Sequence, residues 1–422
     1  MTGRTPAETV LGPEGANSAQ PTELGTGKLV VHVFVPSAFL GIGTGASAPV
    51  LPLSALGHGA SVAVAGLVLA LGGLGMVLGD LPAGRLVSVL GERRSVLLGT
   101  GLGVVGALLC LFSWSVASLA AGILVVGLAG ALWGLARQSY LAAAVPVHRR
   151  ARAISTMAGM HRLGFFAGPF AGAAAIHVSG LSAAYLVQLL AILVAGVLMG
   201  TLRDLPDPDR DPGAATRSVR TVLSAHRRIL GTLGAGALTM GMLRASRNVV
   251  LPLWANHVGV DPAGIALIFG AAGAIDVLAS YPAGYLMDRF GRRFMAVPAI
   301  TVLGAAHAAL PFTTTAAGVG AVALVLGLGS GMSNGVIMTL GADVAPSDTR
   351  AQFLAGWRLA HDTGMCLGPA GIGLLGGVAT LGVACVTMGG VAFLGAGILW
   401  RYIPRYVPWP PPRPALPTPG GA

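Results

Sequence analysis

The feature that most constrains this chain is a succession of apolar segments, each long enough to cross a lipid bilayer and separated by short polar connections. A membrane-spanning helix needs roughly 20 consecutive apolar residues, and such segments recur along nearly the whole sequence. Charged residues make up 10% of the chain, whereas soluble proteins have about a quarter. The sequence therefore predicts an all-α membrane protein and excludes an ordinary cytosolic enzyme.

Twelve transmembrane helices are expected from this hydropathy pattern. They lie near 29–51, 62–83, 95–112, 117–141, 153–176, 181–202, 229–254, 262–285, 294–312, 316–341, 352–378 and 381–403. Composition then divides the chain into a disordered cytoplasmic tail at 1–27, a six-helix bundle at 28–202, a polar cytoplasmic linker at 203–228, a second six-helix bundle at 229–403 and a Pro-rich cytoplasmic tail at 404–422.

Basic residues are distributed unequally between the connections. Alternate connections hold Arg clusters, such as Arg149, Arg150 and Arg152, while the others, near 52–61, 113–116, 177–180, 255–261, 313–315 and 379–381, carry no Lys or Arg. The positive-inside rule then places both termini in the cytoplasm of a multi-pass protein of the cytoplasmic membrane. It also accounts for the net charge of +11 without a nucleic-acid partner, which would need a basic soluble face.

The two halves of the chain match at an offset of 200 residues, without a gap. The matched residues include Pro82, Ala83, Gly84, Gly91 and Arg93, which recur as Pro282, Ala283, Gly284, Gly291 and Arg293. This register holds from about the first span to the fifth. It indicates two six-helix bundles related by a parallel repeat, the arrangement of the two halves of certain transporters.

The stretch GYLMDRFGRR, residues 284–293, resembles the loop signature of the major facilitator superfamily, which follows the second span and again the eighth. The resemblance covers about residues 29–403 and implies gating loops at Gly84, Gly91, Arg93, Gly284, Asp288, Arg289, Gly291, Arg292 and Arg293. The first copy has Ser88 where the signature has Asp. Gly allows a tight turn, and Asp288 is expected to accept from the neighbouring bundle in one conformation only. The alternative is that these charges merely anchor the loop.

The stretch GFFAGPFAG, residues 164–172, resembles the fifth-span signature of drug:proton antiporters, and the eleventh span repeats it as GMCLGPAGIG. This implies a helix-contact motif at Gly164, Gly168, Pro169, Gly364, Gly368 and Pro369. Small residues would let helices of the two bundles approach closely, and Pro would bend the helix there. In the family this motif favours export, although simple packing also produces such Gly spacings. Ile123 stands where many proton-coupled relatives have Arg.

An ionisable group inside a bilayer costs roughly 2.5–3.5 kcal/mol, so each one calls for a partner or a function. In facilitators the first, fourth, seventh and tenth spans line the central cavity. On that pattern the substrate-binding residues are Arg137, Arg244, Arg247, Asn248 and Asn334. Three cations favour a ligand with a carboxylate, a phosphate or another electron-rich group. The alternative for Arg137 is a snorkelling side chain near its helix end.

A second set of ionisable residues is expected at the contacts between bundles, where the second span packs on the eleventh and the fifth on the eighth. Its members, proposed for proton coupling, are Asp80, His161, Arg162, Asp276, Arg358, His361 and Asp362. Asp276 and Asp362 are the better proton candidates, because either His can instead be a hydrogen-bonded helix contact. Depth in the membrane pairs Arg162 with Asp276 and Arg358 with Asp80.

Together these patterns predict a secondary active transporter that moves a small amphiphilic or anionic solute by alternating access, exporting it against proton entry. The partners expected are a small-molecule substrate, protons and the lipid bilayer, and the chain is expected to be a monomer. No enzyme activity, cofactor or metal is expected, because Cys110, Cys366 and Cys385 lack metal-ligand spacing and no phosphate-cradling loop is found. Two alternatives stay open: proton-coupled uptake of an organic anion, and a transporter-like sensor that moves nothing.

Overall fold

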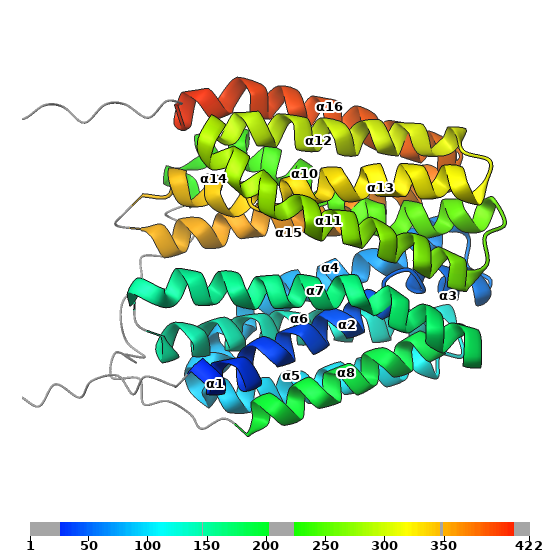
Figure 1. Cartoon of the computed structure of the whole chain (residues 1–422), viewed down its shortest axis with the longest axis horizontal. Coiled ribbons are helices and arrows are strands. Elements are labelled where there is room, and N and C mark those ends of the chain that lie inside the picture. The colour runs from blue at the N-terminus through cyan, green and yellow to red at the C-terminus, as the bar shows by residue number, and fades with distance from the viewer. Residues whose placement is uncertain (1–25, 146, 202–222, 347–348, 409–422) are drawn as a thin grey trace, which may run out of the picture.

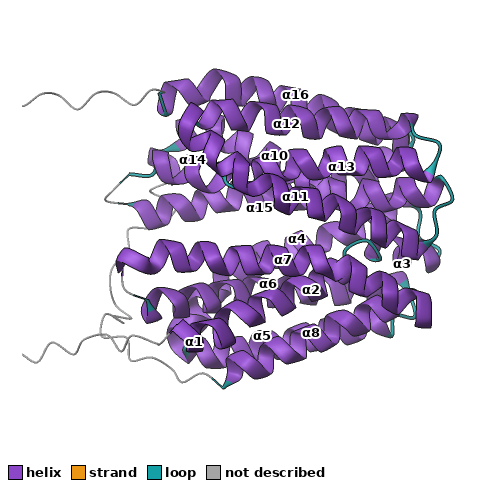
Figure 2. Cartoon of the chain, in the orientation of Figure 1, coloured by secondary structure: helices purple, strands orange, loops and turns teal. Residues whose placement is uncertain are grey.

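Every regular element of the protein is a helix in the computed structural model, which describes residues 26–145, 147–201, 223–346 and 349–408 (Figures 1 and 2). The predicted tails, apart from a few residues, and most of the predicted linker lie outside these residues. Helices are the expected solution in lipid, because a helix satisfies its own backbone N–H and C=O groups where no water can.

The helices form two groups, one from each half of the chain. The first, called the N-terminal bundle, consists of α1 (Thr26–Leu29), the π-helix η1 (Val30–Phe34), α2 (Val35–Ser47), α3 (Leu51–Gly57), α4 (Val62–Leu90), α5 (Glu92–Leu111), α6 (Val116–Ala144), α7 (Val147–Ser179) and α8 (Ala183–Gly200). The second, called the C-terminal bundle, consists of α10 (Arg227–His257), α11 (Pro262–Phe290), α12 (Arg292–Ala309), the 3-10 helix η2 (Leu310–Phe312), α13 (Ala316–Ser333), α14 (Val336–Val344), α15 (Arg350–Val378) and α16 (Leu381–Tyr406).

Nine of the described helical segments are long and apolar enough to cross a membrane. Three other helices are as long, namely α7 with 33 residues, α10 with 31 and α15 with 29, and they stand where the fifth, seventh and eleventh spans are predicted. Charged side chains within them lower their hydropathy. The least apolar long helices are therefore the ones that carry most of the candidate site.

The long helices run roughly side by side along the molecule, with the C-terminal bundle above the N-terminal one in Figure 1. Within the bundles, α2 packs on α7 and α8, α4 on α6, α10 on α15, and α12 on α16. Between the bundles, the main contacts are α4 with α15 and α7 with α11. These contacts confirm the predicted pairing of the second span with the eleventh and of the fifth with the eighth.

The helices of the two halves begin and end at equivalent positions of the sequence repeat in several places. The helix α4 covers 62–90 and α11 covers 262–290, while α5 begins at 92 and α12 at 292. Gly59 and Gly259 both have positive φ, at 82° and 90°. One departure is informative: α6 is continuous, whereas its counterpart is interrupted between α13 and α14 at Asn334 and Gly335.

Several predicted connections are shorter in the structure than expected. α3 extends the first span to Gly57, so most of the predicted connection 52–61 is helical, and α16 continues to Tyr406, beyond the predicted bundle end at 403. The gating loops are shorter still: Gly84 and Gly284 lie inside α4 and α11 rather than in loops. A single residue, Gly91 or Gly291, separates the two helices at each place.

The predicted helix-contact motif does pack helices closely, but within each bundle. A Cβ atom on Gly164 or Gly168 would meet the backbone of α2, and one on Gly364 or Gly368 would meet the backbone of α10. The expectation that these glycines bring the two bundles together is therefore wrong. Pro369 is the exception, since its carbonyl oxygen lies 2.7 Å from the Cβ position of Gly66 on α4.

Other small residues make the close approach between bundles. On one side, Gly66 and Gly73 of α4 face Gly373 and Cys366 of α15. On the other, the rings of Phe166 and Phe170 on α7 cover Gly273 and Gly270 of α11. Helix association in lipid depends on such close packing, because lipid tails are as apolar as the helices themselves. The interface is thus formed by other residues of the same two stretches of α7 and α15, and not by the four motif glycines.

Gly291 offers a direct test of the one-residue turn. Its φ of 90° and ψ of 164° lie in a region that only glycine adopts readily. Gly291→Ala should lower the free energy of unfolding by about 1–3 kcal/mol, measured by thermal unfolding of the purified protein in detergent. Gly284→Ala is the matched control, because Gly284 is helical and a Cβ there meets nothing within 4 Å. Equal stability of both variants would contradict the assignment.

Candidate functional site

The centre of the candidate site is an ion pair between α10 and α11. The Nη1 atom of Arg247 lies 3.3 Å from Oδ2 of Asp276, and the two side chains are 5% and 14% exposed. Both helices belong to the C-terminal bundle. A pair this well buried is costly to break, because the remaining charge is left in a medium that solvates it poorly.

Asn334 and Ser330 are side-chain hydrogen-bond partners of the Asp276 carboxylate, and Ser280 lies beside Asn334. The Nδ2 atom of Asn334 donates to Oδ1 of Asp276 at 2.6 Å and to the Ser280 hydroxyl at 2.7 Å. Ser280 in turn donates to the backbone carbonyl of Asp276 at 2.7 Å. Asn334 is placed there by the interruption between α13 and α14. One carboxylate thus connects the predicted seventh, eighth and tenth spans.

Three further arginines lie in this region of the structure. Arg244 on α10 and Arg162 on α7 lie close enough to Asp276 to interact with it electrostatically. Arg137 on α6 interacts in the same way with His161. Among the described residues, none of these three guanidinium groups forms an ion pair. Three cations, Arg247, Arg244 and Arg162, therefore lie near a single carboxylate, and Arg137 lies beside the adjoining His161.

Several polar atoms here are buried but have no hydrogen-bond partner among the described residues. They are Nε and Nη1 of Arg137, Nε of Arg247, Oδ1 of Asn248 and Oδ1 of Asn334. Buried polar groups are normally paired, and each exception calls for an explanation. The four residues that carry these atoms all belong to the predicted substrate-binding set. Its fifth member, Arg244, is the electrostatic neighbour of Arg247.

An aromatic surface adjoins the charged centre. The Cζ atom of Arg247 lies 5.7 Å from the ring centroid of Phe269, a cation–π distance. The ring of Phe165 on α7 lies 6.1 Å from that of Phe269. The guanidinium group that holds Asp276 therefore lies over the ring of Phe269, which is itself in contact with a ring from the other bundle.

A second cluster of ionisable groups joins α15 to α4. The guanidinium of Arg358 lies 3.9 Å from Asp80 and 3.3 Å from Asp362, and Nδ1 of His361 lies 3.0 Å from Asp362. The predicted contact of Arg358 with Asp80 is confirmed. The Arg358 side chain is 46% exposed and that of Asp80 30%, so this pair is less buried than expected.

The other predicted pair is wrong in this conformation: Asp276 is bound to Arg247, and Arg162 is only its electrostatic neighbour. The two predicted proton-handling histidines also differ from each other. His161 contacts the backbone carbonyl of Ser37 on α2 at 3.3 Å, which is the helix-contact alternative. His361 instead contacts a carboxylate.

The loop residues pair inside one bundle rather than across the interface. Arg292 lies 3.0 Å from Asp288 and 2.8 Å from Asp343, and all three belong to the C-terminal bundle. The expected contact of Asp288 with the neighbouring bundle is therefore not the one formed here. Arg289 donates to the Tyr285 hydroxyl at 3.3 Å. In the first copy, Arg93 donates to the carbonyl of Gly200 at 2.8 Å.

Sequence reasoning missed three residues of this region. Ser280 follows Asp276 by one helical turn, a spacing that could have been noticed, whereas nothing in the sequence distinguishes Phe269 from other apolar residues. The third is His307 on α12, which is fully buried and contacts the Ser246 hydroxyl at 2.9 Å. A His within an apolar span was the available signal.

Apolar helices around a buried, positively charged centre, arranged as two repeated bundles, are the features of a membrane transporter. Comparison with protein families agrees. The model of the Major Facilitator Superfamily matches residues 33–245 and again residues 233–420. These matches cover most of the chain, so the chain belongs to the Major Facilitator Superfamily.

Related proteins and structures are consistent with this assignment. An uncharacterized MFS-type transporter of Methanocaldococcus jannaschii is 22% identical over 365 residues, which cover 85% of this chain and 94% of that protein. One from Salmonella arizonae is 24% identical over 52% of this chain and 56% of its own length.

Solved structures share the fold at low sequence identity. The D-xylose-proton symporter superposes with a TM-score of 0.71 at 15% identity, covering 90% of this chain and 98% of that one. A POT family transporter in complex with 5-aminolevulinic acid also gives 0.71, at 12% identity over 92% and 99% of the two chains. The fold is thus that of secondary transporters.

The pair of Arg247 and Asp276 can be tested by a double-mutant cycle. Asp276→Leu should cost about 3–5 kcal/mol of stability, because it leaves Arg247 buried without its carboxylate. Arg247→Met should cost less, since Arg244 and Arg162 remain near Asp276. The double variant should lose less stability than the two single variants lose together, as measured by thermal unfolding in one detergent. Additive losses would show that the two groups are not coupled.

Proposed function

We propose that this chain is a proton-coupled secondary transporter that moves a small anionic or amphiphilic solute across the cytoplasmic membrane by alternating access. The observation that carries the proposal is the excess of partly buried cations in the region of Asp276 and His161. Arg137, Arg162 and Arg244 have no ion-pair partner among the described residues, although each costs free energy in a bilayer. An anionic substrate would supply the missing charge, because guanidinium groups bind carboxylates and phosphates in a paired geometry.

The pairing of Arg247 with Asp276 supports coupling to protons. An anion that binds Arg247 competes with Asp276 for the same guanidinium group. The displaced carboxylate would then be unpaired in a poorly solvating site, which favours its protonation. Arg244 and Arg162 oppose that step, while Asn334 and Ser330 can hydrogen-bond to either form of the carboxyl group. Anion and proton would therefore be bound together and cross together.

The aromatic rings beside Arg247 support an amphiphilic substrate. Phe269 and Phe165 offer apolar surface within reach of the charged centre, one from each bundle. A solute with an anionic group and an apolar body would contact both. Because its binding would draw on α7 and α11 together, it would also affect the interface that must change during alternating access.

Direction separates two candidate functions. Binding of anion and proton together favours co-transport, which an inward proton gradient would drive as uptake. Export against proton entry is the second candidate, favoured by the Gly-Pro motif at 164–172 and its repeat in α15. Both candidates assume cytoplasmic termini, which the Arg-rich connections support. Accumulation in right-side-out vesicles would indicate uptake, and accumulation in everted vesicles would indicate export.

Asp276→Asn tests the coupling directly. In proteoliposomes with an imposed proton gradient, this variant should lose accumulation of the anion found by screening carboxylates and phosphate esters. It should keep exchange of labelled for unlabelled anion, because Asn still occupies the site without titrating. Asp261→Asn is the control, since Asp261 is an exposed N-cap that Asn replaces well. Unchanged accumulation in Asp276→Asn would refute proton coupling at this residue. No flux of any solute would favour the sensor alternative.

Arg244→Gln tests the charge preference of the site. Loss of a hydrogen bond to a charged group costs about 1.5–3 kcal/mol, so the KM for the anion should rise by about tenfold or more. Folding should survive, because Arg244 forms no ion pair among the described residues. Arg227→Gln is the control: it removes the same charge at the exposed start of the same helix. An unchanged KM would remove Arg244 from the site.

A further inference from the structure

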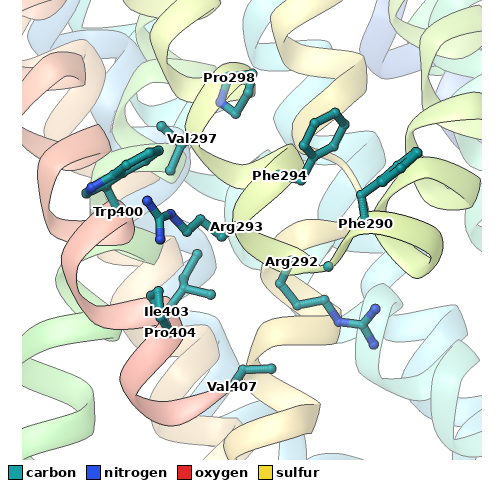
Figure 3. Close-up of a pocket in the computed structure, with 11 residues that line it drawn as sticks. Phe290, Arg292, Arg293, Phe294, Val297, Pro298, Trp400, Ile403, Pro404 and Val407 are labelled. Atoms are coloured by element: carbon teal, nitrogen blue, oxygen red, sulfur yellow. The ribbon is translucent and has the colours of Figure 1, made fainter. Parts of the chain in front are cut away.

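A pocket unrelated to the central site lies between α12 and α16 (Figure 3). Its volume is about 340 Å³, within the range of about 300–1,000 Å³ that is usual for ligand sites. Its walls include Phe290, Phe294, Val297 and Trp400, and Arg293 projects into it. It lies where α12 begins and α16 ends, which places it at the membrane surface rather than in the transport path.

The charge in this pocket is not neutralised by the protein. The Cζ atom of Arg293 lies 3.3 Å from the ring centroid of Trp400, while no carboxylate pairs with Arg293 among the described residues. The neighbouring Arg292 also lines the pocket, but its guanidinium group has carboxylate partners in Asp288 and Asp343. A second cavity of about 290 Å³, lined in part by Arg401 and Arg405, adjoins the ring of Trp400.

The internal repeat indicates that these residues are not required by the fold. At the same offset of 200 residues from Trp400 and Arg401, the first copy has Gly200 and Thr201. There, Arg93, the counterpart of Arg293, donates a hydrogen bond to the carbonyl of Gly200. In the described residues of the first copy, which end at Thr201 on this side, the same helix pair therefore has neither an aromatic ring at the place of Trp400 nor a cation at that of Arg401.

The pocket is open to the outside of the bundle. Trp400 is 58% exposed, Phe294 is 51% and Phe290 is 44%, although all are large and apolar. In a membrane-spanning protein, such rings near helix ends lie at the lipid interface, and basic pockets between helices there bind anionic headgroups. A free phosphate would use the cations but not this apolar wall. A phospholipid would use both.

We propose that this pocket binds one anionic phospholipid of the adjacent leaflet. Its phosphodiester group pairs with Arg293 and is drawn in by Arg401 and Arg405, while the upper part of an acyl chain lies against Phe294 and Val297. The proposal depends on the membrane location of the chain and not on the transported solute.

Native mass spectrometry of the full-length protein in detergent tests it, with phosphatidylglycerol, phosphatidylcholine and inorganic phosphate as separate probes. The parent should bind phosphatidylglycerol at least tenfold more tightly than phosphatidylcholine. Arg293→Gln and Trp400→Leu should each reduce that preference at least tenfold. Arg94→Gln is the control, because it removes an exposed charge near the start of α5, the helix that corresponds to α12 in the first copy.

Two results would overturn the proposal. One is equal binding of phosphatidylglycerol by the parent and by both pocket variants. The other is inorganic phosphate that displaces phosphatidylglycerol at comparable concentration, which would identify a simple anion site. Because both side chains are partly exposed, neither variant should unfold. Arg401→Gln, at the rim of the adjoining cavity, provides a milder variant that should show an intermediate loss of preference.

Discussion

The lack of water in the bilayer is the constraint on which the rest of this structure depends. It requires each span to satisfy its own backbone, so the described elements are helical. It also removes the usual drive for helices to associate, so their contacts rely on backbones that approach closely at residues such as Gly66 and Gly373. Finally, it raises the free-energy cost of every buried charge, so that each one needs a partner or a function. The pair of Arg247 and Asp276 is the strongest example, because two charges and their hydrogen-bond partners are held where solvation is poorest.

Much of the fold could be predicted from the sequence, because it depends on hydropathy and on the repeat. The offset of 200 residues reappears in helix ends and in the positive φ of Gly59 and Gly259. Counting depth along helices also placed Arg358 beside Asp80 correctly. These are one-dimensional properties, and the sequence contains them directly.

Rotation about the helix axis could not be predicted in the same way. Arg162 and Asp276 have similar depths, yet the face of α11 that carries Asp276 meets Arg247 instead. The four motif glycines of α7 and α15 were expected at the bundle interface, but they face α2 and α10. Which face a small residue presents depends on the packing of several helices at once. A buried partner such as His307 is hidden from sequence reasoning by the same difficulty.

The interruption at Asn334 and Gly335 gives the two bundles unequal mechanical roles. In the N-terminal bundle the equivalent helix, α6, is an unbroken rod of 29 residues. In the C-terminal bundle, the side chain that bonds to Asp276 lies at the joint between α13 and α14, where the ladder of backbone hydrogen bonds is weakest. The carboxylate of Asp276 is therefore bonded to the joint itself, and α6 has no equivalent break. A broken helix bends more easily than a continuous one, so the two copies of the repeat differ in stiffness at this position.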